Sequence, residues 1–547
     1  MEALRLGPTR RELLAALAGL PLAACARARS VLAPPGVIAG GNATLGHRLR
    51  TGELLARPPV RTERIGTAIL GAGVSGLSVA WTMARAGDLD FRLLELEREP
   101  GGTARSGGNA VSLYPWGAHY VPVPVSPNPA LEALLAEVGA LTGRGPDGQP
   151  QWAEEMLCRE PEERLFLGGL WYEGLYPRAG ASRDDLAQLA RFEETMRAFA
   201  ARVDSRGRRA FALPRRLSSE DGDLTALDRL SFADWLRSER LTSARLHWFV
   251  EYGCRDDFGG TLAETSAWAG IHYYAARLPG HAKSETAAPF LTWPEGNGRL
   301  VAQLARAAQG KVTSGALVFD VRPAATGVEV RYLDAARDEV VLLQAEHAVF
   351  ALPKYLAGRV VAPWREGAPA HLAAFSYVPW LVANLTLKDR PPERGYPLSW
   401  DNVIHGSASL GYVVATHQKG RDRGPTVFTY YRPFAGEEPG AARQRLLSAS
   451  HAELSAAVMA ELGRAHPELP SLVTRLDVYR WGHAMARPVP GFLWSAALVK
   501  AREPLGRLRF AHADLSGLPL FEEAQDAGVR AAEDILREKR VRFAPLT

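Results

Sequence analysis

The residues Thr67-Ala68-Ile69-Leu70-Gly71-Ala72-Gly73-Val74-Ser75-Gly76 join a short apolar strand to a glycine-rich turn. Apolar residues at helical spacing follow, so we expect a helix directly after the turn. Gly71 permits the tight turn, Gly73 lets the backbone approach a pyrophosphate, and Gly76 brings the helix close to the strand. The N-terminus of that helix offers free N–H groups and a partial positive charge. The stretch therefore predicts a phosphate cradle. A glycine-rich loop in another kind of α/β sheet is the alternative.

A second strand, Phe91–Glu95, ends in an acid nineteen residues after Gly76. A carboxylate at this place accepts hydrogen bonds from the ribose hydroxyls of a dinucleotide. Strand, glycines, helix, strand and acid in this order predict a dinucleotide-binding site of the Rossmann type.

A second pair of glycines follows shortly after the acid, in Gly101-Gly102-Thr103-Ala104-Arg105-Ser106. At this point the chain resembles the flavin-containing amine oxidase superfamily, in which a Gly-Gly segment and an arginine run under the pyrophosphate and ribityl chain of FAD. The residue directly after the glycines is usually arginine and is Thr103 here. We expect Arg105 to take over its role. The resemblance implies FAD as the cofactor.

The resemblance resumes downstream and covers most of the chain beyond the N-terminal segment. Val318 matches an adenine-contacting position, and Trp293–Leu300 looks like the family's segment before a helix. Asp514 ends a strand at the place of the family's ribityl-binding acid. Glu523 and Ala524 then open a helix whose N-terminus faces the flavin pyrimidine in this family, where negative charge accumulates on reduction. Because no cysteine lies in an attachment motif, we expect the FAD to be bound without a covalent bond.

The fold expected is α/β, with a Rossmann-type FAD-binding domain and a discontinuous α+β substrate domain. The FAD-binding domain is assigned to residues 61–145, 286–365 and 481–547. A mainly helical part of the substrate domain is assigned to 146–285, where Ser182 is expected to cap a helix, and a sheet part to 366–480.

One residue that many amine oxidases share is missing. In this superfamily the flavin takes hydride from a C–N or C–C bond, while the protein positions the substrate. Many members add a lysine that holds a water at flavin N5. The matching strand, Val378–Leu387, contains no lysine, and Lys388 lies just past its end. The departure puts ordinary amine oxidation in doubt.

A histidine and several aromatic residues are the catalytic candidates. His119 and Tyr120 lie in the loop that flanks the isoalloxazine ring in this family. His119 is expected to act as a base, to orient the substrate, or only to hydrogen-bond the flavin or the backbone. Trp481 is a candidate for an aromatic cage, and its segment also looks like that of protoporphyrinogen oxidases and desaturases. Other candidates, equally compatible with a place in the core, are Tyr430, Tyr431 and Trp494.

The composition excludes several classes of function. The 547 residues are 47% hydrophobic and 23% charged, an ordinary globular mix with room for two or more domains. The net charge of +5 is small and no long basic run is present, so nucleic-acid binding is not expected. Three cysteines exclude a disulfide scaffold, and no motif predicts a metal site. Pairing between Cys158 and Cys254 stays open.

The first 25 residues are expected to be an export signal. Arg10-Arg11 precede an Ala/Leu-rich run that is too short to span a membrane. The pair resembles a twin-arginine signal, and Leu22–Cys25 resembles a lipoprotein box with Cys25 as the lipidated residue. An Ala-rich helix with a chance arginine pair is the alternative. Residues 26–60 are rich in Pro, Gly and Arg and are expected to be a linker. This pattern predicts a protein of the periplasm or cell envelope.

These observations predict an FAD-dependent oxidoreductase that takes hydride from a small organic substrate. An amine is the leading substrate, with oxygen or another acceptor reoxidising the flavin. Dehydrogenation or isomerisation at a C–C bond is the alternative on the same fold. A flavoprotein without catalytic activity is the alternative of another class.

Overall fold

A parallel sheet forms the centre of the first domain. The structure, a computed structural model, describes residues 33–146, 148–279 and 289–547. Five parallel strands lie in the order β12 (Val312–Ser314), β3 (Phe91–Glu95), β2 (Arg61–Leu70), β15 (Glu339–Phe350) and β21 (Leu508–Phe510). An antiparallel pair, β14 (Val328–Asp334) and β13 (Ala316–Pro323), continues the sheet from the first half of β15.

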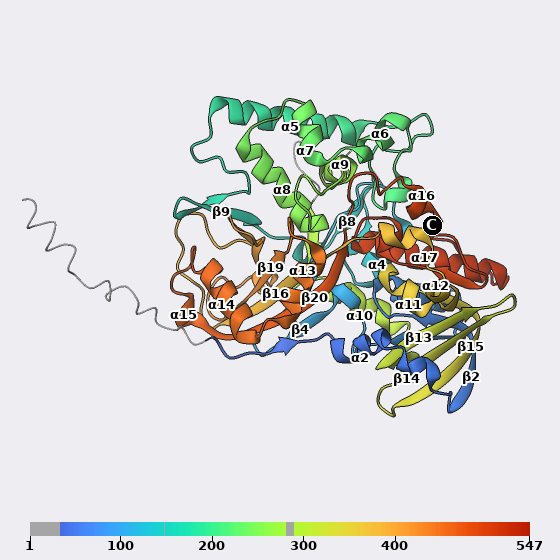
Figure 1. Cartoon of the computed structure of the whole chain (residues 1–547). Helices are drawn as coiled ribbons and strands as arrows, with labels where there is room; N and C mark the ends of the chain where they lie inside the picture. The colour runs from blue at the N-terminus through green and yellow to red at the C-terminus, as the bar shows by residue number, and fades with distance from the viewer. Residues whose placement is uncertain (1–32, 147, 280–288) are drawn as a thin grey trace, which may run out of the picture.

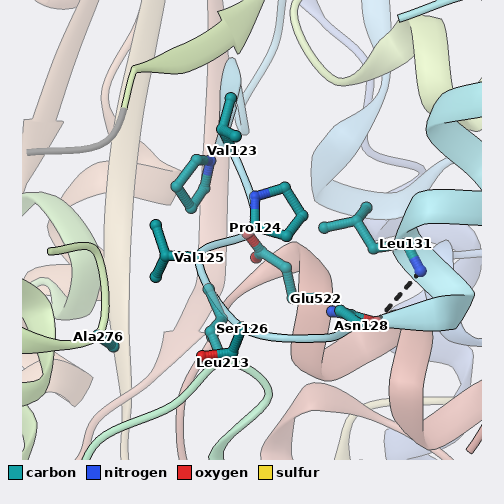
Figure 2. A pocket seen from close by; sticks show the side chains of 10 residues that line it. Val123, Pro124, Val125, Ser126, Asn128, Leu131, Leu213, Ala276 and Glu522 are labelled. Carbon is teal, nitrogen blue, oxygen red and sulfur yellow. Dashed lines mark hydrogen bonds between the residues drawn. The ribbon is translucent and has the colours of Figure 1, made fainter. Parts of the chain in front are cut away.

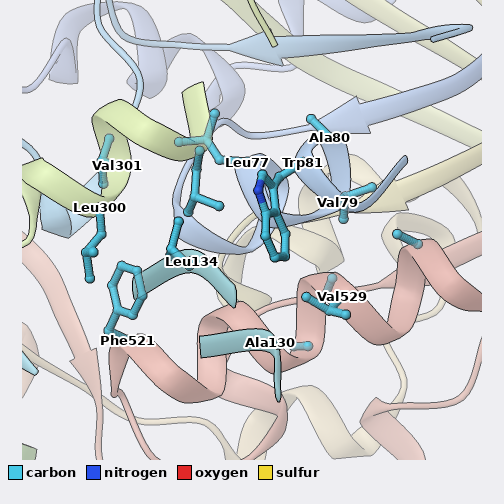
Figure 3. Close-up of a cluster of buried hydrophobic side chains, with 14 of the residues drawn as sticks. Leu77, Val79, Ala80, Trp81, Ala130, Leu134, Leu300, Val301, Phe521 and Val529 are labelled. Carbon is cyan, nitrogen blue, oxygen red and sulfur yellow. The ribbon is translucent and has the colours of Figure 1, made fainter. Parts of the chain in front are cut away.

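Helices cover one face of this sheet, and their packing is shown in Figure 3. They are α3 (Val74–Arg85), α4 (Pro129–Glu137), α10 (Gly298–Arg306) and α17 (Phe521–Glu538). The central strands are apolar on both sides because the second face is covered as well, by the β13–β14 pair and the short helices α11 (Ala357–Val360) and α12 (Ala362–Glu366).

An eight-stranded sheet forms the second domain. Its order is β1 (Ile38–Ala39), β20 (Val473–Ala486), β16 (Tyr377–Leu387), β19 (Thr426–Pro433), β18 (Gly411–Val414), β17 (Asp401–Ile404), β9 (Glu163–Leu167) and β10 (Leu170–Glu173). One face packs against α13 (Pro439–Ser448) and α14 (His451–Leu462), whereas the other carries aromatic side chains. β20 runs past residue 480, so the sheet extends beyond the boundary expected from the sequence.

A helical layer completes the second domain and gathers at one end of the molecule (Figure 1). It comprises α5 (Arg183–Ala201), α6 (Gly222–Ala226), α7 (Phe232–Ser238), α8 (Ala244–Phe258) and α9 (Ala267–Ala275). Ser182 caps α5, because its hydroxyl accepts the Asp185 N–H and the Asp185 carboxylate accepts the Ser182 N–H. This helix start is confirmed.

The segment expected to be a linker is folded over much of its length. Residues 37–57, called the strap below, run from the second domain to the β13–β14 pair, as the blue ribbon in Figure 1 shows. β1 pairs in parallel with β20, and Leu45 and Leu54 are buried against a group comprising Leu317, Phe319, Leu333 and Val340. The linker prediction is wrong here because it rested on composition, whereas the strap is held by strand pairing and by two buried leucines.

The architecture confirms the α/β class and the division into a Rossmann-type domain and an α+β domain. In the described ranges, no helix is long and apolar enough to cross a membrane. The segment 1–25, with Arg10, Arg11 and Cys25, lies outside the described residues.

Candidate functional site

The glycine-rich turn lies between β2 and α3, as expected from the sequence. Gly71 has a φ of +98°, a conformation that favours glycine. A Cβ on Gly76 would lie 1.9 Å from the Gly71 carbonyl oxygen, so the helix and the strand can approach this closely only at glycine. The α3 N-cap, Gly73, provides no side-chain cap, which leaves the first N–H groups of the helix free for a ligand.

Ser75 shows that this turn fits a phosphate group. Its side chain is 3% exposed, and among the described residues its hydroxyl has no hydrogen-bond partner. A buried hydroxyl without a partner is costly, and a phosphate oxygen at the helix N-terminus would accept its hydrogen. The residues present therefore fit the pyrophosphate of FAD.

Glu95 stands at the end of β3, beside the turn. Its carboxylate accepts the Ala72 N–H at 2.7 Å and the Glu97 N–H at 2.9 Å, one on each oxygen. Burial raises the pKa of Glu95, and the two N–H bonds oppose that shift. Each oxygen retains acceptor capacity for a ribose hydroxyl.

The second glycine pair faces the first. A Cβ on Gly102 would approach the Gly73 Cα to 3.2 Å, so the two turns are in close contact. The Arg105 guanidinium lies 5.6 Å from the Tyr479 ring and 5.7 Å from the Trp481 ring, and it makes no ion pair with any described residue. Its Nε donates to the Gly102 carbonyl, and a guanidinium without an ion pair is consistent with the predicted role of Arg105 beside the pyrophosphate.

The remaining predicted cofactor contacts lie on β13, after β21 and at the start of α17. Val318 is buried on β13, and Asp514 follows β21. The Asp514 carboxylate accepts the Lys354 N–H at 2.8 Å and the Tyr377 hydroxyl at 2.5 Å. Burial alone would raise the pKa of Asp514, but His512 and these hydrogen bonds outweigh it and hold the pKa below its usual value. Contact of Asp514 with ribityl hydroxyls stays a prediction.

The first turn of α17 contains two buried glutamates. Glu523 accepts the Arg215 N–H at 2.5 Å, so its carboxylate points to the helical layer, and Ala524 follows it in the helix. Glu522 borders a small cavity of about 10 Å³, next to Pro124 in Figure 2. Within the described part of the chain, Glu522 Oε1 has no partner. Burial raises the pKa of both carboxyls to about 7.

His119 and Tyr120 belong to a cluster of aromatic rings between the two domains. The His119 ring stacks on Tyr431 with centroids 4.6 Å apart and lies 5.4 Å from Trp400. Tyr120 and Phe290 complete this group, called the His119 cluster below. Burial lowers the pKa of His119 to about 4, so its imidazole is neutral at neutral pH. A base with this pKa is weak, and the geometry favours an orienting role.

An acidic group that the sequence analysis did not identify borders the cluster. The Tyr120 hydroxyl lies 3.3 Å from Asp256 Oδ2 and 3.4 Å from Asp257 Oδ1, both on α8. Arg277 pairs with Asp257 at 2.6 Å, whereas Asp256 makes no ion pair with a described residue. Burial, and the charge of Asp257 after it, raise the pKa of Asp256.

A third carboxylate lies on the same side of the sheet. The Tyr252 hydroxyl donates to Asp401 Oδ2 at 2.6 Å, and burial raises the pKa of Asp401. The negative charge of Asp256 also raises the pKa of Asp401. Three carboxylates therefore lie beside the His119 cluster, and Arg277 pairs with one of them, Asp257.

The other aromatic candidates are dispersed. Trp481 stacks on Tyr479 at 4.0 Å and donates to the Trp116 carbonyl at 2.6 Å, which places it on the Arg105 side. Tyr430 points to the opposite face of the sheet, where its hydroxyl reaches Glu461. Trp494 packs under Arg215. Of these candidates, the structure brings only Tyr431 to His119.

β16 passes beside the His119 cluster, and this strand is the one that contains no lysine. Val378, Trp380 and Val382 point to the aromatic face of the sheet. Lys388 follows the strand and is exposed.

Cys158 and Cys254 are both buried and free, so they do not form a disulfide with each other.

Comparison with known proteins agrees with this geometry. The family model described as flavin-containing amine oxidoreductase matches residues 74–536. The chain belongs to this family. It is therefore an FAD-dependent oxidoreductase of the amine oxidase type, and FAD is its cofactor. None of the curated protein sequences matches this chain.

Solved structures share the fold at low sequence identity. A putrescine oxidase double mutant matches with a TM-score of 0.64 and 19% identity, over 87% of this chain and all of that one. Cyclohexylamine oxidase from Brevibacterium oxydans IH-35A matches with a TM-score of 0.60 and 17% identity, over 88% of this chain and 100% of that chain. A fatty acid isomerase from P. acnes that produces CLA matches with a TM-score of 0.56 and 13% identity, over 87% of this chain and 98% of that chain. At these identities the matches establish the fold and leave the substrate open.

Proposed function

We propose that the flavoenzyme oxidises an amine, which binds as an ammonium ion beside Asp256. The observation that carries this proposal is the Asp256 carboxylate, which is partly buried, faces Tyr120 and makes no ion pair in the described ranges, since the nearby Arg277 pairs with Asp257 instead. A carboxylate left in this state is costly, and an ammonium group would both pair with it and lower its pKa. The rings of the His119 cluster add cation–π attraction.

The residues around this position have distinct tasks in such a reaction. Bound FAD supplies the chemistry by accepting hydride from the carbon next to the nitrogen. Asp256 binds the ammonium group and accepts one of its protons, because only the neutral amine can release hydride and leave as an iminium ion. Tyr120 fixes the carboxylate by a hydrogen bond. His119, neutral and stacked on Tyr431, forms a wall that excludes water and orients the substrate. The electron acceptor that reoxidises the flavin is oxygen or another small molecule.

An apolar substrate fits these surroundings less well. Oxidation at a C–C bond, the competing activity, would leave Asp256 unpaired and place carbon chains beside Asp401. Because a fatty acid isomerase has a similar fold, the test below includes unsaturated fatty acids as substrates.

The test is anaerobic reduction of the FAD-loaded protein by a panel of substrates, followed by loss of the visible flavin absorbance. We expect aliphatic and aromatic amines to bleach the flavin and unsaturated fatty acids to leave it oxidised. Asp256→Asn should weaken amine binding by about tenfold or more through loss of one charge-assisted contact, and it should also lower the limiting rate because asparagine cannot accept the ammonium proton. Asp534→Asn, at an exposed pair with Arg537, is the control. Bleaching by fatty acids alone, or unchanged amine affinity in Asp256→Asn, would refute the proposal.

We also propose that the protein is exported with its cofactor bound. The cofactor site joins Gly71 to Asp514, because β15 pairs with both β2 and β21, so it forms only when the domain is complete. Such a site must be loaded where FAD is made, and a twin-arginine signal serves folded proteins. Cell fractionation should find Arg10→Lys/Arg11→Lys retained in the cytoplasm with FAD, and Cys25→Ser exported but free of membranes. Unchanged export of the double variant would exclude the twin-arginine route, and a native protein free of membranes would exclude only the anchor.

A further inference from the structure

A groove separate from the His119 cluster lies between the strap and the segment 355–365. Its volume is about 490 Å³, within the range of small-molecule sites. The strap side is lined by Arg48, Leu49, Arg50, Thr51, Gly52, Leu54 and Leu55, and the opposite side by Phe319, Tyr355, Gly358, Arg359 and Arg365.

Four arginines line this groove, and two of them have no acidic partner. Arg48 pairs with Glu53 and Asp338, and Arg365 pairs with the buried Asp320. Among the described residues, the guanidinium of Arg50 makes one hydrogen bond, to the His47 ring at 3.0 Å. That of Arg359 makes no hydrogen bond or ion pair with any residue that the structure describes. The groove therefore carries an excess of positive charge, and two guanidinium groups are free to bind an anion.

The groove also has apolar walls. Phe319 packs with Leu54 under the strap, and Tyr355 is 37% exposed. The Tyr355 ring stacks on His483 with centroids 4.0 Å apart, so its position is fixed. A ligand in the groove would meet ring and leucine surface beside the arginines.

The groove lies on a different side of β13 from the predicted adenine contact. Val318 packs into the layer that contains Ala68 and Leu94 of the central strands. Phe319, the next residue, points to the strap and lines the groove. The β13 ladder is irregular between Val318 and Asp320, so the placement of the two side chains rests on these contacts, and Leu49 of the groove packs against both groups.

We propose that this groove, called the arginine groove below, binds a small organic anion whose phosphate or carboxylate group is attached to an apolar or aromatic body. Arg50 and Arg359 bind the anionic group through charge-assisted hydrogen bonds, and Phe319 and Tyr355 contact the body. The site is independent of the amine position, because its lining shares no residue with the His119 cluster.

The test is calorimetric titration of the FAD-loaded protein at low ionic strength with AMP, with benzoate and with inorganic phosphate. We expect AMP or benzoate to bind with one molecule per chain, and whichever binds identifies the anionic group. Inorganic phosphate should bind more weakly than AMP because it lacks the body. The variant Arg50→Gln/Arg359→Gln should weaken binding by about tenfold or more. Arg183→Gln/Arg229→Gln removes two exposed arginines elsewhere and should leave the affinity unchanged.

Four results would overturn the proposal. Absence of binding by both AMP and benzoate would exclude the site, and unchanged affinity in Arg50→Gln/Arg359→Gln would exclude these arginines. Equal affinity for phosphate and AMP would remove the role of the apolar walls. Release of FAD by AMP, or loss of FAD from the double variant, would show that the groove is part of the cofactor site. Retained flavin absorbance throughout the titration supports a separate site.

Discussion

Gly76→Ala should abolish stable FAD binding. The added Cβ would lie 1.9 Å from the Gly71 carbonyl oxygen, whereas ordinary contact begins at 3.4 Å, so α3 must move away from β2 by about 1.5 Å, the difference of these two distances. A hydrogen bond of about 2.9 Å from a helix N–H to the pyrophosphate would then exceed bonding distance. Loss of two charge-assisted bonds at about 1.5 kcal/mol each lowers the affinity at least about a hundredfold.

The measurement is fluorescence titration of the apoprotein with FAD, together with the flavin content after dialysis. Circular dichroism checks that the variant is folded, since overpacking costs about 1–3 kcal/mol of stability. Gly222→Ala is the matched control, because a Cβ there meets no atom within 4 Å. If folded Gly76→Ala bound FAD as tightly as the native protein, the assignment of this turn to the pyrophosphate would be refuted.

Three further predictions concern the cofactor site and the buried acids. Burial raises the pKa of Glu522 to about 7, so the folded state holds this proton more tightly than the unfolded chain, and stability falls as pH rises from the ordinary glutamate range towards 7. Glu522→Gln should therefore have the higher Tm at pH 8, and a Tm difference that is the same at pH 5 would contradict this cause. Glu95→Gln should weaken FAD binding by about tenfold or more through loss of charge-assisted ribose contacts, while the exposed Glu99→Gln should not, as dialysis would show. Acid precipitation should release a yellow supernatant, because neither Cys158 nor Cys254 lies in an attachment motif for flavin, and colour in the precipitate would disprove non-covalent binding.

Local patterns in the sequence predict the cofactor half of the molecule well. The strand, turn and helix around Gly71 depend on neighbouring residues, and so does the capped start of α5 at Ser182. Their geometry follows from glycine's conformational freedom and from a capping side chain, which act over a few residues.

The acidic part of the site could not be predicted in this way. Asp256 and Asp257 are adjacent on α8, where a pair of acids usually indicates a solvated helix face. Their chemistry arises only because α8 packs Asp257 against Arg277, which follows α9, and against Tyr120 from a distant part of the chain. Tyr430 and Tyr431 show the same limit, since the alternation of a strand sends one ring to each face, and the sheet order decides which face meets His119.

The strap has a consequence for the order in which the chain folds during synthesis. Ile38 pairs with Val478, and the Val37 N–H donates to Asp477 across 440 positions of sequence. A ribosome must translate nearly the whole chain before this early segment finds its partner strand. During that time the strap stays accessible to cellular factors, and its docking becomes one of the last events of maturation.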